Sequence, residues 1–332
     1  MKLLIIGGSG IISGEVCAAA LNNGDEVTIF NRGRRPEQLD KRAKLVAGNI
    51  REESAESIAA RLDGEYDVVA DFLSYTPEHV EKTLEIVKNR CKQYIFASSA
   101  TAYNDIGDAV YTESVPVGEC FWSYAQQKAD CEYYLRALDL PCKYTIVRPY
   151  VTYGRTRLPY QVAPLQYYTI IDRIKKHKPI MICNENTRCT LTYAPEFAVG
   201  VYGLMLNEKA YGEAFHVTTH HNTTWGHVIR AVAERLGEPL ELVDIPREYL
   251  LAHRDGRGVD IDEILGDKSR DMVLDNAKIR SAVPAFRPDT DIDKGLDAVF
   301  EFFSEPHHQI VNAEWDAALD AYIEEYIKNC EK

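Results

Sequence analysis

Short apolar runs and amphipathic segments alternate along residues 1–150 of the chain. The runs are rich in β-branched, aromatic and leucine side chains, as expected of strands that are buried on both faces of a parallel sheet. They cover residues 3–6, 26–30, 44–46, 66–72, 93–98 and 144–148. The amphipathic segments predict helices from 11 to about 24 and over 53–62, 77–89 and 124–138. This alternation predicts an α/β fold with a doubly wound parallel sheet.

Beyond Tyr153 the alternation becomes irregular, which indicates a second and smaller region. The stretch GRTRLPYQVAP predicts a crossing segment, and the last residues predict an amphipathic helix. We expect a dinucleotide-binding (Rossmann) domain and a smaller mixed substrate region at the carboxyl ends of its strands. The first comprises 1–153 plus about 190–220, and the second comprises 154–190 and 221–332. Within this part we expect the crossing segment at 154–164, a helix to about 176, strands near 214–217 and 240–243, and helices over 225–236, 291–303 and 314–332.

The first strand runs into a glycine turn that opens the first helix. Gly7, Gly10 and Ser13 follow the spacing G-x-x-G-x-x-S, with Ser13 small enough for the helix to pack closely on the strand. Unpaired N–H groups and the helix dipole converge at such a turn, so it can bind a pyrophosphate. Ser9, Ile11 and Ile12 belong to the same loop. A tight turn that binds nothing remains the alternative.

The loops after the next strands complete a possible cofactor site. Asn31 stands where an acidic residue commonly binds the adenosine ribose, and Arg32 follows it, which favours NADP over NAD. After the third strand, Asn49 and Ile50 are placed to flank an adenine. After the fourth, Phe72 and Leu73 would pass under the cofactor.

Tyr124 and Lys128 are four residues apart on a predicted helix and therefore share one face. An ammonium beside a phenol lowers the pKa of the phenol from about 10 toward neutrality. Such a phenol can exchange a proton with a substrate hydroxyl while a hydride passes to or from a nicotinamide. Ser99, at the end of the fifth strand, could hydrogen-bond the same oxygen. A chance pair of tyrosine and lysine is the alternative.

Four motifs, GGSGIIS, FASSATAY, YAQQK and VRPYVTYG, occur in an order and spacing that resemble one known family. They resemble the extended short-chain dehydrogenase/reductases, the NAD-dependent epimerase/dehydratases, of which UDP-galactose 4-epimerase is a familiar member. The resemblance covers the whole chain and is strongest over 1–154. It implies that Thr101 and Tyr150 face the substrate and that Pro149 lies beside the nicotinamide. By the same resemblance the catalytic triad is Ser99, Tyr124 and Lys128, and the phosphate loop includes Gly7, Gly10, Ile11 and Ile12.

The chain also departs from this family's pattern. Val151 replaces the asparagine of the usual RPxNxYG, and Pro195 and Glu196 stand where an acidic pair is common. Lys268 and Arg270 lie too close to the LDNAK motif to match the arginine that commonly binds a diphosphate. These departures weaken a UDP-sugar as the substrate but leave the predicted redox centre intact.

Composition narrows the class of partners. The net charge of −13 disfavours a nucleic-acid surface. The eight cysteines form no C-x-x-C pair, which argues against a zinc site or disulfides, and no apolar run is long enough to span a membrane. We therefore expect a cytoplasmic protein without a bound metal. His216, His220 and His221 are interpreted as loop or surface residues, and the three tryptophans as packing residues.

The leading hypothesis is an NAD(P)-dependent enzyme that oxidises or reduces a secondary alcohol of a sugar or sugar nucleotide. The first alternative is an NADPH-dependent ketoreductase or dehydrogenase acting on a non-nucleotide carbonyl. The second is a nucleotide-binding regulator or RNA-associated protein that has lost its chemistry. The family resemblance is also compatible with a homodimer.

Overall fold

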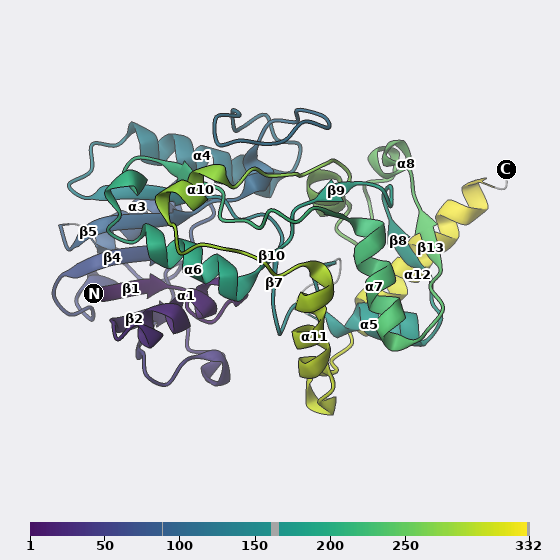
Figure 1. The fold of residues 1–332 in the computed structure, drawn as a ribbon, viewed down its shortest axis with the longest axis horizontal. Coiled ribbons are helices and arrows are strands. Elements are labelled where there is room, and N and C mark those ends of the chain that lie inside the picture. Colours follow the sequence, from purple (N-terminus) through teal and green to yellow (C-terminus); the bar gives the residue numbers. More distant parts are fainter. Residues whose placement is uncertain (88, 161–165, 331–332) are drawn as a thin grey trace.

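Seven parallel strands form the central sheet in the computed structural model, which describes residues 1–87, 89–160 and 166–330. The strands are β1 (Lys2–Ile6), β2 (Glu26–Asn31), β3 (Lys44–Ala47), β4 (Tyr66–Asp71), β5 (Cys91–Ala97), β6 (Lys143–Val147) and β11 (Ala214–Phe215). Their order in space is β11-β6-β5-β4-β1-β2-β3, and every neighbouring pair is parallel. The predicted doubly wound α/β fold is therefore confirmed (Figure 1).

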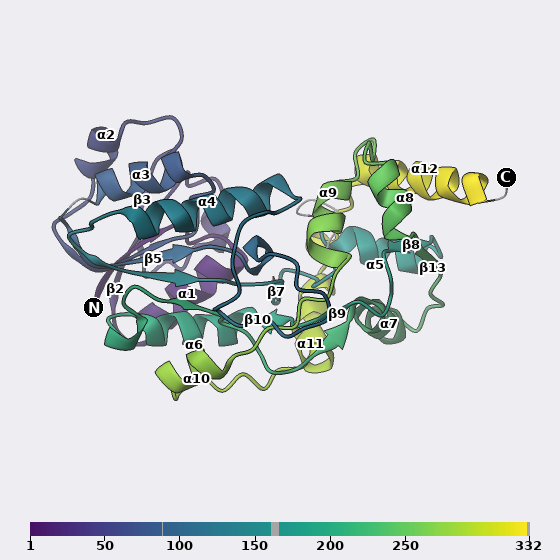
Figure 2. The ribbon, with the colours of Figure 1, turned by 90° about the horizontal axis from the view of Figure 1, so that it is seen from above.

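Helices cover both faces of this sheet (Figure 2). Leu3 and Ile5 of β1 face one core, and Leu4 and Ile6 face the other, because successive side chains of a strand point to opposite faces. The first core is covered by α1 (Ile11–Asn22), α6 (Ala194–Leu204) and α10 (Ala277–Ala282), and the second by α2 (Ala55–Ala59), α3 (Pro77–Ile86) and α4 (Ser123–Ala137).

Two of the predicted helices are longer than those observed. The helix predicted over 53–62 extends only over α2, where Ser54 caps the first turn through its side chain. The helix predicted over 77–89 ends at Ile86, and Asn89 beyond it has φ +57°, a left-handed conformation that a helix cannot continue. Residue 88 lies outside the described residues.

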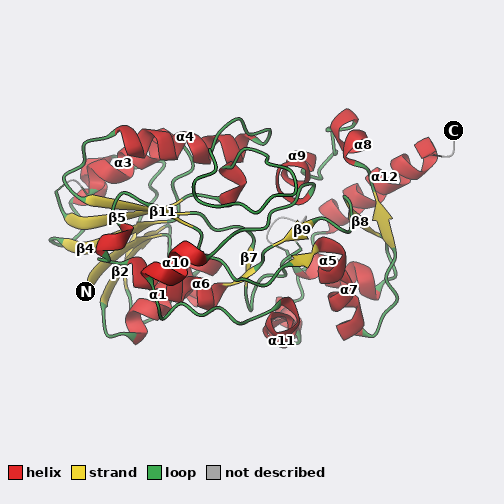
Figure 3. Ribbon diagram, turned by 45° about the horizontal axis from the view of Figure 1, so that its top comes forward, coloured by secondary structure: helices red, strands yellow, loops and turns green. Residues whose placement is uncertain are grey.

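The rest of the chain forms a second, mainly helical part around its own core (Figure 3). The predicted helix at 225–236 is observed with those bounds, whereas residues 161–164 of the predicted crossing segment lie outside the described residues. The helices are α5 (Tyr168–Lys175), α7 (Trp225–Leu236), α8 (Arg247–Ala252), α9 (Ile261–Glu263), α11 (Ile292–Phe303) and α12 (Ala313–Cys330), with a π-helix, η4 (Ile264–Lys268). Short strands pair as β7 (Thr152–Tyr153) with β10 (Thr192–Tyr193), β9 (Arg188–Cys189) with β12 (Thr223–Thr224), and β8 (Ile180–Ile182) with β13 (Leu242–Asp244).

Residues 277–286 return from the second part of the chain to the sheet. Ile279, Val283 and Phe286 are buried in the core beneath α6, and Val283 lies so close to Gly203 that a Cβ there would approach within 2.2 Å of it. We propose that this segment belongs with the dinucleotide-binding domain, in addition to the ranges expected from the sequence. The short 3-10 turns are η1 (Pro36–Gln38), η2 (Ala100–Ala102), η3 (Glu208–Ala210) and η5 (Pro306–His308).

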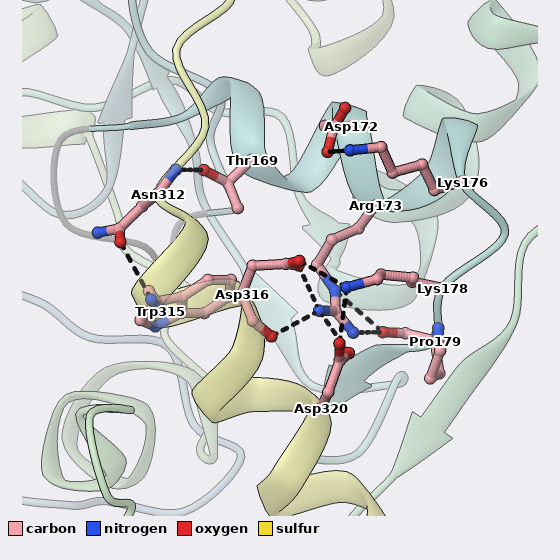
Figure 4. Close-up of polar contacts among 10 residues, drawn as sticks. All are labelled: Thr169, Asp172, Arg173, Lys176, Lys178, Pro179, Asn312, Trp315, Asp316 and Asp320. Atoms are coloured by element: carbon pink, nitrogen blue, oxygen red, sulfur yellow. Dashed lines mark hydrogen bonds and ion pairs between the residues drawn. The ribbon is translucent and has the colours of Figure 1, made fainter.

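The C-terminal helix α12 is fixed to α5 by one buried arginine (Figure 4). The guanidinium of Arg173 forms ion pairs with Asp316 and Asp320 and donates to the carbonyl of Pro179 at 2.6 Å. Lys178 binds the same two carboxylates. Arg173 is fully buried and binds two carboxylates of α12. This cluster therefore holds α12 to α5 at the core of the second, mainly helical part.

Candidate active site

The glycine turn after β1 has the geometry of an anion site. Gly7 and Gly8 have φ +127° and +80°, and a Cβ on Gly8 would lie 2.8 Å from a methyl group of Ile29. Within the part of the chain that the structure describes, the N–H groups of Ile11 and Ile12 have no hydrogen-bond partner. Two free donors at the positive end of a helix, beside a backbone without side chains, fit a pyrophosphate.

Ser13 closes this turn where a third glycine could stand. Its Oγ accepts a hydrogen bond from the N–H of Gly10 at 3.1 Å, and the side chain is buried under the first turn of α1. Ser9 lies at the partly exposed apex of the loop. Serine therefore gives the close packing of helix and strand and also satisfies one backbone donor of the loop.

Asn31, at the end of β2, is committed to the glycine turn. Its amide donates to the carbonyl of Gly7 at 2.5 Å, and its Oδ1 accepts from the N–H of Gly33. The side chain of Asn31 is buried, whereas Arg32 beside it is exposed. Asn31 thus shapes the loop, and Arg32 is the residue whose charge faces solvent at the edge of the site.

The loops after β3 and β4 lie on the same edge of the sheet. Ile50 is buried, and the N–H of Asn49 donates to Glu53. Phe72 lies against the glycine turn, since a Cβ added to Gly7 would be 3.4 Å from the Cβ of Phe72. Leu73 is partly buried beside it. The predicted cofactor residues therefore surround one edge, as the parallel sheet requires.

The sequence interpretation missed Asp71, which fixes the turn after β4. This buried carboxylate accepts the N–H groups of Leu73 and Ser74 and the hydroxyls of Ser74 and Tyr94. The carbonyl of Ser74 then points at Lys128. Only its place at a strand end could have singled out Asp71.

Lys128 is buried under the aromatic ring of Tyr75. Its Nζ donates to the carbonyls of Ser74 and Ala97, at 2.7 Å each, and lies 4.7 Å from the centre of the Tyr75 ring. Burial lowers the pKa of Lys128 to about 8, opposed by nearby acidic groups, so the ammonium predominates at neutral pH. The cation is 5.9 Å from the centre of the Tyr124 ring. Tyrosine and lysine therefore adjoin, as their spacing predicted.

The expected lowering of the Tyr124 pKa is wrong for this structure. Burial between the rings of Trp122 and Tyr75, with centroids at 4.7 and 6.0 Å, raises the pKa of the Tyr124 phenol. The Ser99 hydroxyl and the charge of Arg157 oppose this shift only in part. Lys128 does not offset it because its Nζ is directed to two backbone carbonyls.

The predicted substrate residues meet where β5 and β6 end. The hydroxyls of Ser99 and Thr101 lie 2.7 Å apart, and the N–H of Ala100 donates to the carbonyl of Pro149 at 2.8 Å. Tyr150 is buried, and its hydroxyl donates to the backbone carbonyl of Asp267 at 2.6 Å. The structure thus brings these residues together and adds Asp267, which follows them by more than 100 residues in sequence.

The interpretation of the histidines was incomplete. His216 lies in the loop after β11, as expected, but it is fully buried. Its Nδ1 bonds to the carbonyl of Asp275 and its Nε2 accepts from Tyr103, so it is a core residue and not a surface residue. His220 is exposed and His221 partly so. The fold places Asp289 beside both, with one ligand atom of each residue within 4.8 Å of the others, a proximity that sequence spacing did not reveal.

Burial of His216 predicts a pH dependence of stability. Its pKa is lowered to about 4, chiefly by burial, from an ordinary value near 6.5. The unfolded chain therefore binds an extra proton between these values, and stability should fall as the pH drops from 6.5 toward 4, by about 3 kcal/mol in total. Urea unfolding of wild type and His216→Gln at several pH values measures this. His227→Gln, an exposed histidine, should keep the wild-type slope; an unchanged slope in His216→Gln would contradict the assignment.

In the part of the chain that the structure describes, no helix is both long and apolar enough to cross a membrane.

The sequence model described as the NAD dependent epimerase/dehydratase family matches residues 3–218. The chain belongs to this family. The match runs from β1 to β11 and contains the whole central sheet and α4. This family is the one that the motifs of the sequence predicted.

Relatives of this epimerase/dehydratase chain carry different names. A chloroplast stem-loop binding protein of 41 kDa (b) from Arabidopsis thaliana is 27% identical over 258 residues, which are 72% of this chain and 64% of that protein. This chain therefore spans less than two thirds of that relative. A UDP-glucose 4-epimerase from Klebsiella pneumoniae is 34% identical over 139 residues, covering 34% of this chain and 100% of that sequence.

A solved structure has the same fold. It is a UDP-glucuronic acid 4-epimerase from Bacillus cereus in complex with UDP-glucuronic acid and NAD, with a TM-score of 0.73 and 15% sequence identity. The similarity covers 92% of this chain and 99% of that chain. At this identity the likeness supports the fold alone.

Proposed function

We propose that this enzyme oxidises, or oxidises and then reduces, a secondary alcohol of a sugar or sugar nucleotide. The observation that carries the proposal is the meeting of Ser99, Tyr124 and Lys128 at the carboxyl edge of the sheet, next to the glycine turn. The similarity to a sequence named UDP-glucose 4-epimerase supports this substrate class. The departures at Val151 and at the diphosphate arginine allow other sugars.

The residues of the site have distinct roles in this proposal. The glycine turn, with Ile11 and Ile12, holds the pyrophosphate of a nicotinamide cofactor, which supplies reversible hydride acceptance when bound. Tyr124 takes the proton from the substrate hydroxyl, and Ser99 holds the reacting oxygen by a hydrogen bond. The Lys128 ammonium stabilises the phenolate electrostatically. Because burial raises the pKa of Tyr124, the phenolate forms as the pH rises, and Lys128 then supplies its counter-charge.

Two outcomes share this first step. When the keto intermediate stays bound and is reduced again, the net reaction is epimerisation and the cofactor never leaves. When the product leaves, the enzyme is a ketoreductase or dehydrogenase, and a preference for NADP fits this case better. Extraction of nucleotide from the purified protein, followed by a hydride-exchange assay, tests the proposal. Bound, non-exchanging dinucleotide supports the epimerase, a site that needs added NADPH supports the reductase, and the absence of any dinucleotide binding overturns both.

Cofactor choice depends on Arg32 in this proposal. Arg32→Ala should weaken NADP binding by about 10- to 100-fold, because a charge-assisted contact to the 2′-phosphate is lost, and should leave NAD binding nearly unchanged. Arg34→Ala, an exposed arginine two residues on, is the matched control and should change neither constant. Titration of both dinucleotides against protein fluorescence measures the constants. An equal loss for NAD and NADP would contradict a role in recognising the phosphate.

A second candidate function is nucleic-acid binding, which only the name of the Arabidopsis relative favours. The net charge of −13 opposes it, because phosphate contacts need clustered cations. A gel-shift assay with a stem-loop RNA at two salt concentrations decides the matter, since true binding weakens steeply with salt. Our proposal expects no shift.

Location and assembly are also part of the proposal. We place the protein in the cytoplasm, because all eight cysteines are free in the structure, which suits a reducing compartment. We further propose a homodimer, on the family resemblance alone. Sedimentation analysis of the purified chain tests the second statement.

A further inference from the structure

The π-helix η4 brings a buried charged pair beside Tyr124. Asp267 and Lys268 are both more than nine-tenths buried, and the Lys268 Nζ donates to Oδ2 of Asp267 at 2.8 Å. Burial alone would lower the pKa of Lys268, but the carboxylates of Asp267 and Glu263 raise it. Lys268 is therefore held as an ammonium within the protein interior. Such π-turns occur frequently at functional sites.

Packing fixes this turn against the aromatic wall of the site. A Cβ on Gly266 would lie 2.6 Å from the Cβ of Trp122, so only glycine allows this approach. Trp122 in turn contacts the ring of Tyr124. On the other side, the Tyr150 hydroxyl donates to the carbonyl of Asp267. These contacts of its neighbour Gly266 and of its own carbonyl place Asp267 beside Tyr124, whose pKa its charge raises.

Two buried polar atoms near this turn have no hydrogen-bond partner among the described residues. They are Oδ1 of Asp267 and Nε of Arg157. Arg157 is near enough to Tyr124 and Lys268 for its charge to lower the pKa of each side chain. A carboxylate oxygen can only accept and a guanidinium N–H can only donate. Buried polar groups of this kind normally have a hydrogen-bond partner in the protein, in ordered water or in a ligand.

We infer that Asp267 and Arg157 form a subsite for a polyhydroxylated substrate, in which Asp267 Oδ1 accepts from a substrate hydroxyl and Arg157 donates to a substrate oxygen. The inference rests on the proposed function and specifies its substrate class: a hydroxyl lies near the carbon that reacts at Tyr124. Lys268 acts as a positioning residue, because its ammonium binds Oδ2 of Asp267 and so orients the buried carboxylate. The absence of a counterpart to the diphosphate-binding arginine does not affect this subsite, because the subsite recognises the sugar and not the nucleotide.

Calorimetric titration of Asp267→Asn tests the inference. The probes are UDP-glucose, UDP-glucuronic acid and glucose 1-phosphate, added to protein saturated with NADH or NADPH, whichever binds more tightly. For the probe that binds wild type best, the dissociation constant should rise about 10- to 100-fold, because the carboxylate acceptor is lost. Glu263→Gln is the matched control, since it removes the other carboxylate of Lys268 without facing Tyr124, and should leave binding nearly unchanged. Affinity for the reduced dinucleotide should stay the same in both variants.

Three results overturn the subsite. The first is an unchanged dissociation constant of the best probe in Asp267→Asn, and the second is an equal loss of affinity for the probe and for the reduced dinucleotide. The third is no binding of any probe to wild type at 10 mM, roughly the weakest useful affinity for a small ligand. If Asp267→Asn does not fold, Arg157→Gln makes the same test, since that guanidinium stands outside the buried pair. Hydride exchange is measured separately. Hydride exchange in wild type, together with wild-type affinity of the probes for Asp267→Asn, overturns the subsite and leaves the proposed function standing. Probe binding that depends on Asp267, in a protein that shows no hydride exchange, overturns the proposed function and leaves the subsite standing.

Discussion

Tyr124→Phe is expected to reduce hydride exchange by about 10²- to 10⁴-fold, the range that a positioned general acid or base contributes. The physical reason is local. The phenol oxygen is the group beside Ser99 that can take a proton, and phenylalanine keeps the ring between Trp122 and Tyr75 while removing that oxygen. Stability and dinucleotide affinity should therefore stay near wild type. Stopped-flow measurement of nicotinamide absorbance with a bound sugar substrate gives the rate.

The matched control for this variant is Tyr133→Phe on the same helix. Tyr133 is half-exposed, and its hydroxyl donates to the carbonyl of Val117, away from the site. Its loss should leave the rate unchanged. A rate in Tyr124→Phe within threefold of wild type would remove Tyr124 from the chemistry, because an effect of that size falls below what a general base supplies, roughly 10²-fold.

The pH profile offers a further view of the same residue. Because burial raises the Tyr124 pKa, the rate in the oxidative direction should increase with pH. The slope of rate against pH should become shallower above about pH 8, because Lys128 loses its proton there and the phenolate loses its counter-charge. Lys128→Met should remove this change of slope. The rate of Lys128→Met should still rise with pH.

The fold was predictable because its signals are local. Leu3–Ile6 and the glycine turn that follows read as strand, turn and helix from neighbouring residues, and the parallel order then places every strand end on one edge. Asn49, Phe72, Ser99 and Pro149 fall into the site for that reason alone. The helix ends were less predictable, because Asn89 adopts a left-handed conformation that periodicity does not encode.

The second half of the site was not predictable from the sequence. Asp267 belongs to a π-helix that the sequence pattern did not reveal, and tertiary packing of Gly266 on Trp122 brings it to Tyr124. The pKa of Tyr124 was misjudged for a related reason, since spacing on a helix gives adjacency but not the direction of the Lys128 ammonium. Likewise, His216 lies in a loop by sequence, yet its hydrogen bonds place it in the core.

Glu132→Ala is expected to lower the free energy of unfolding by about 3–5 kcal/mol, the usual effect of removing one partner from a buried ion pair. Glu132 is fully buried on α4, one turn beyond Lys128, and accepts from Arg148 through Oε1 at 2.8 Å and Oε2 at 2.5 Å. Ser98 donates to the same carboxylate at 2.6 Å. Its loss leaves the buried Arg148 guanidinium with no carboxylate partner, only the Tyr103 hydroxyl and the carbonyl of Glu113. Urea unfolding should therefore show a lower midpoint at unchanged slope.

Two companion variants give this measurement its meaning. Arg136→Ala removes an exposed cation 3.9 Å from Glu132 and should cost less than about 1 kcal/mol, because solvent screens that pair. The double variant Glu132→Leu with Arg148→Met removes both charges and should recover much of the loss, since the penalty comes from the unpaired charge. A loss below about 1 kcal/mol in Glu132→Ala would contradict the buried pair. Because Glu132 and Lys128 share α4, a loosened helix should also slow hydride exchange, and the double variant should restore it in proportion to the stability regained.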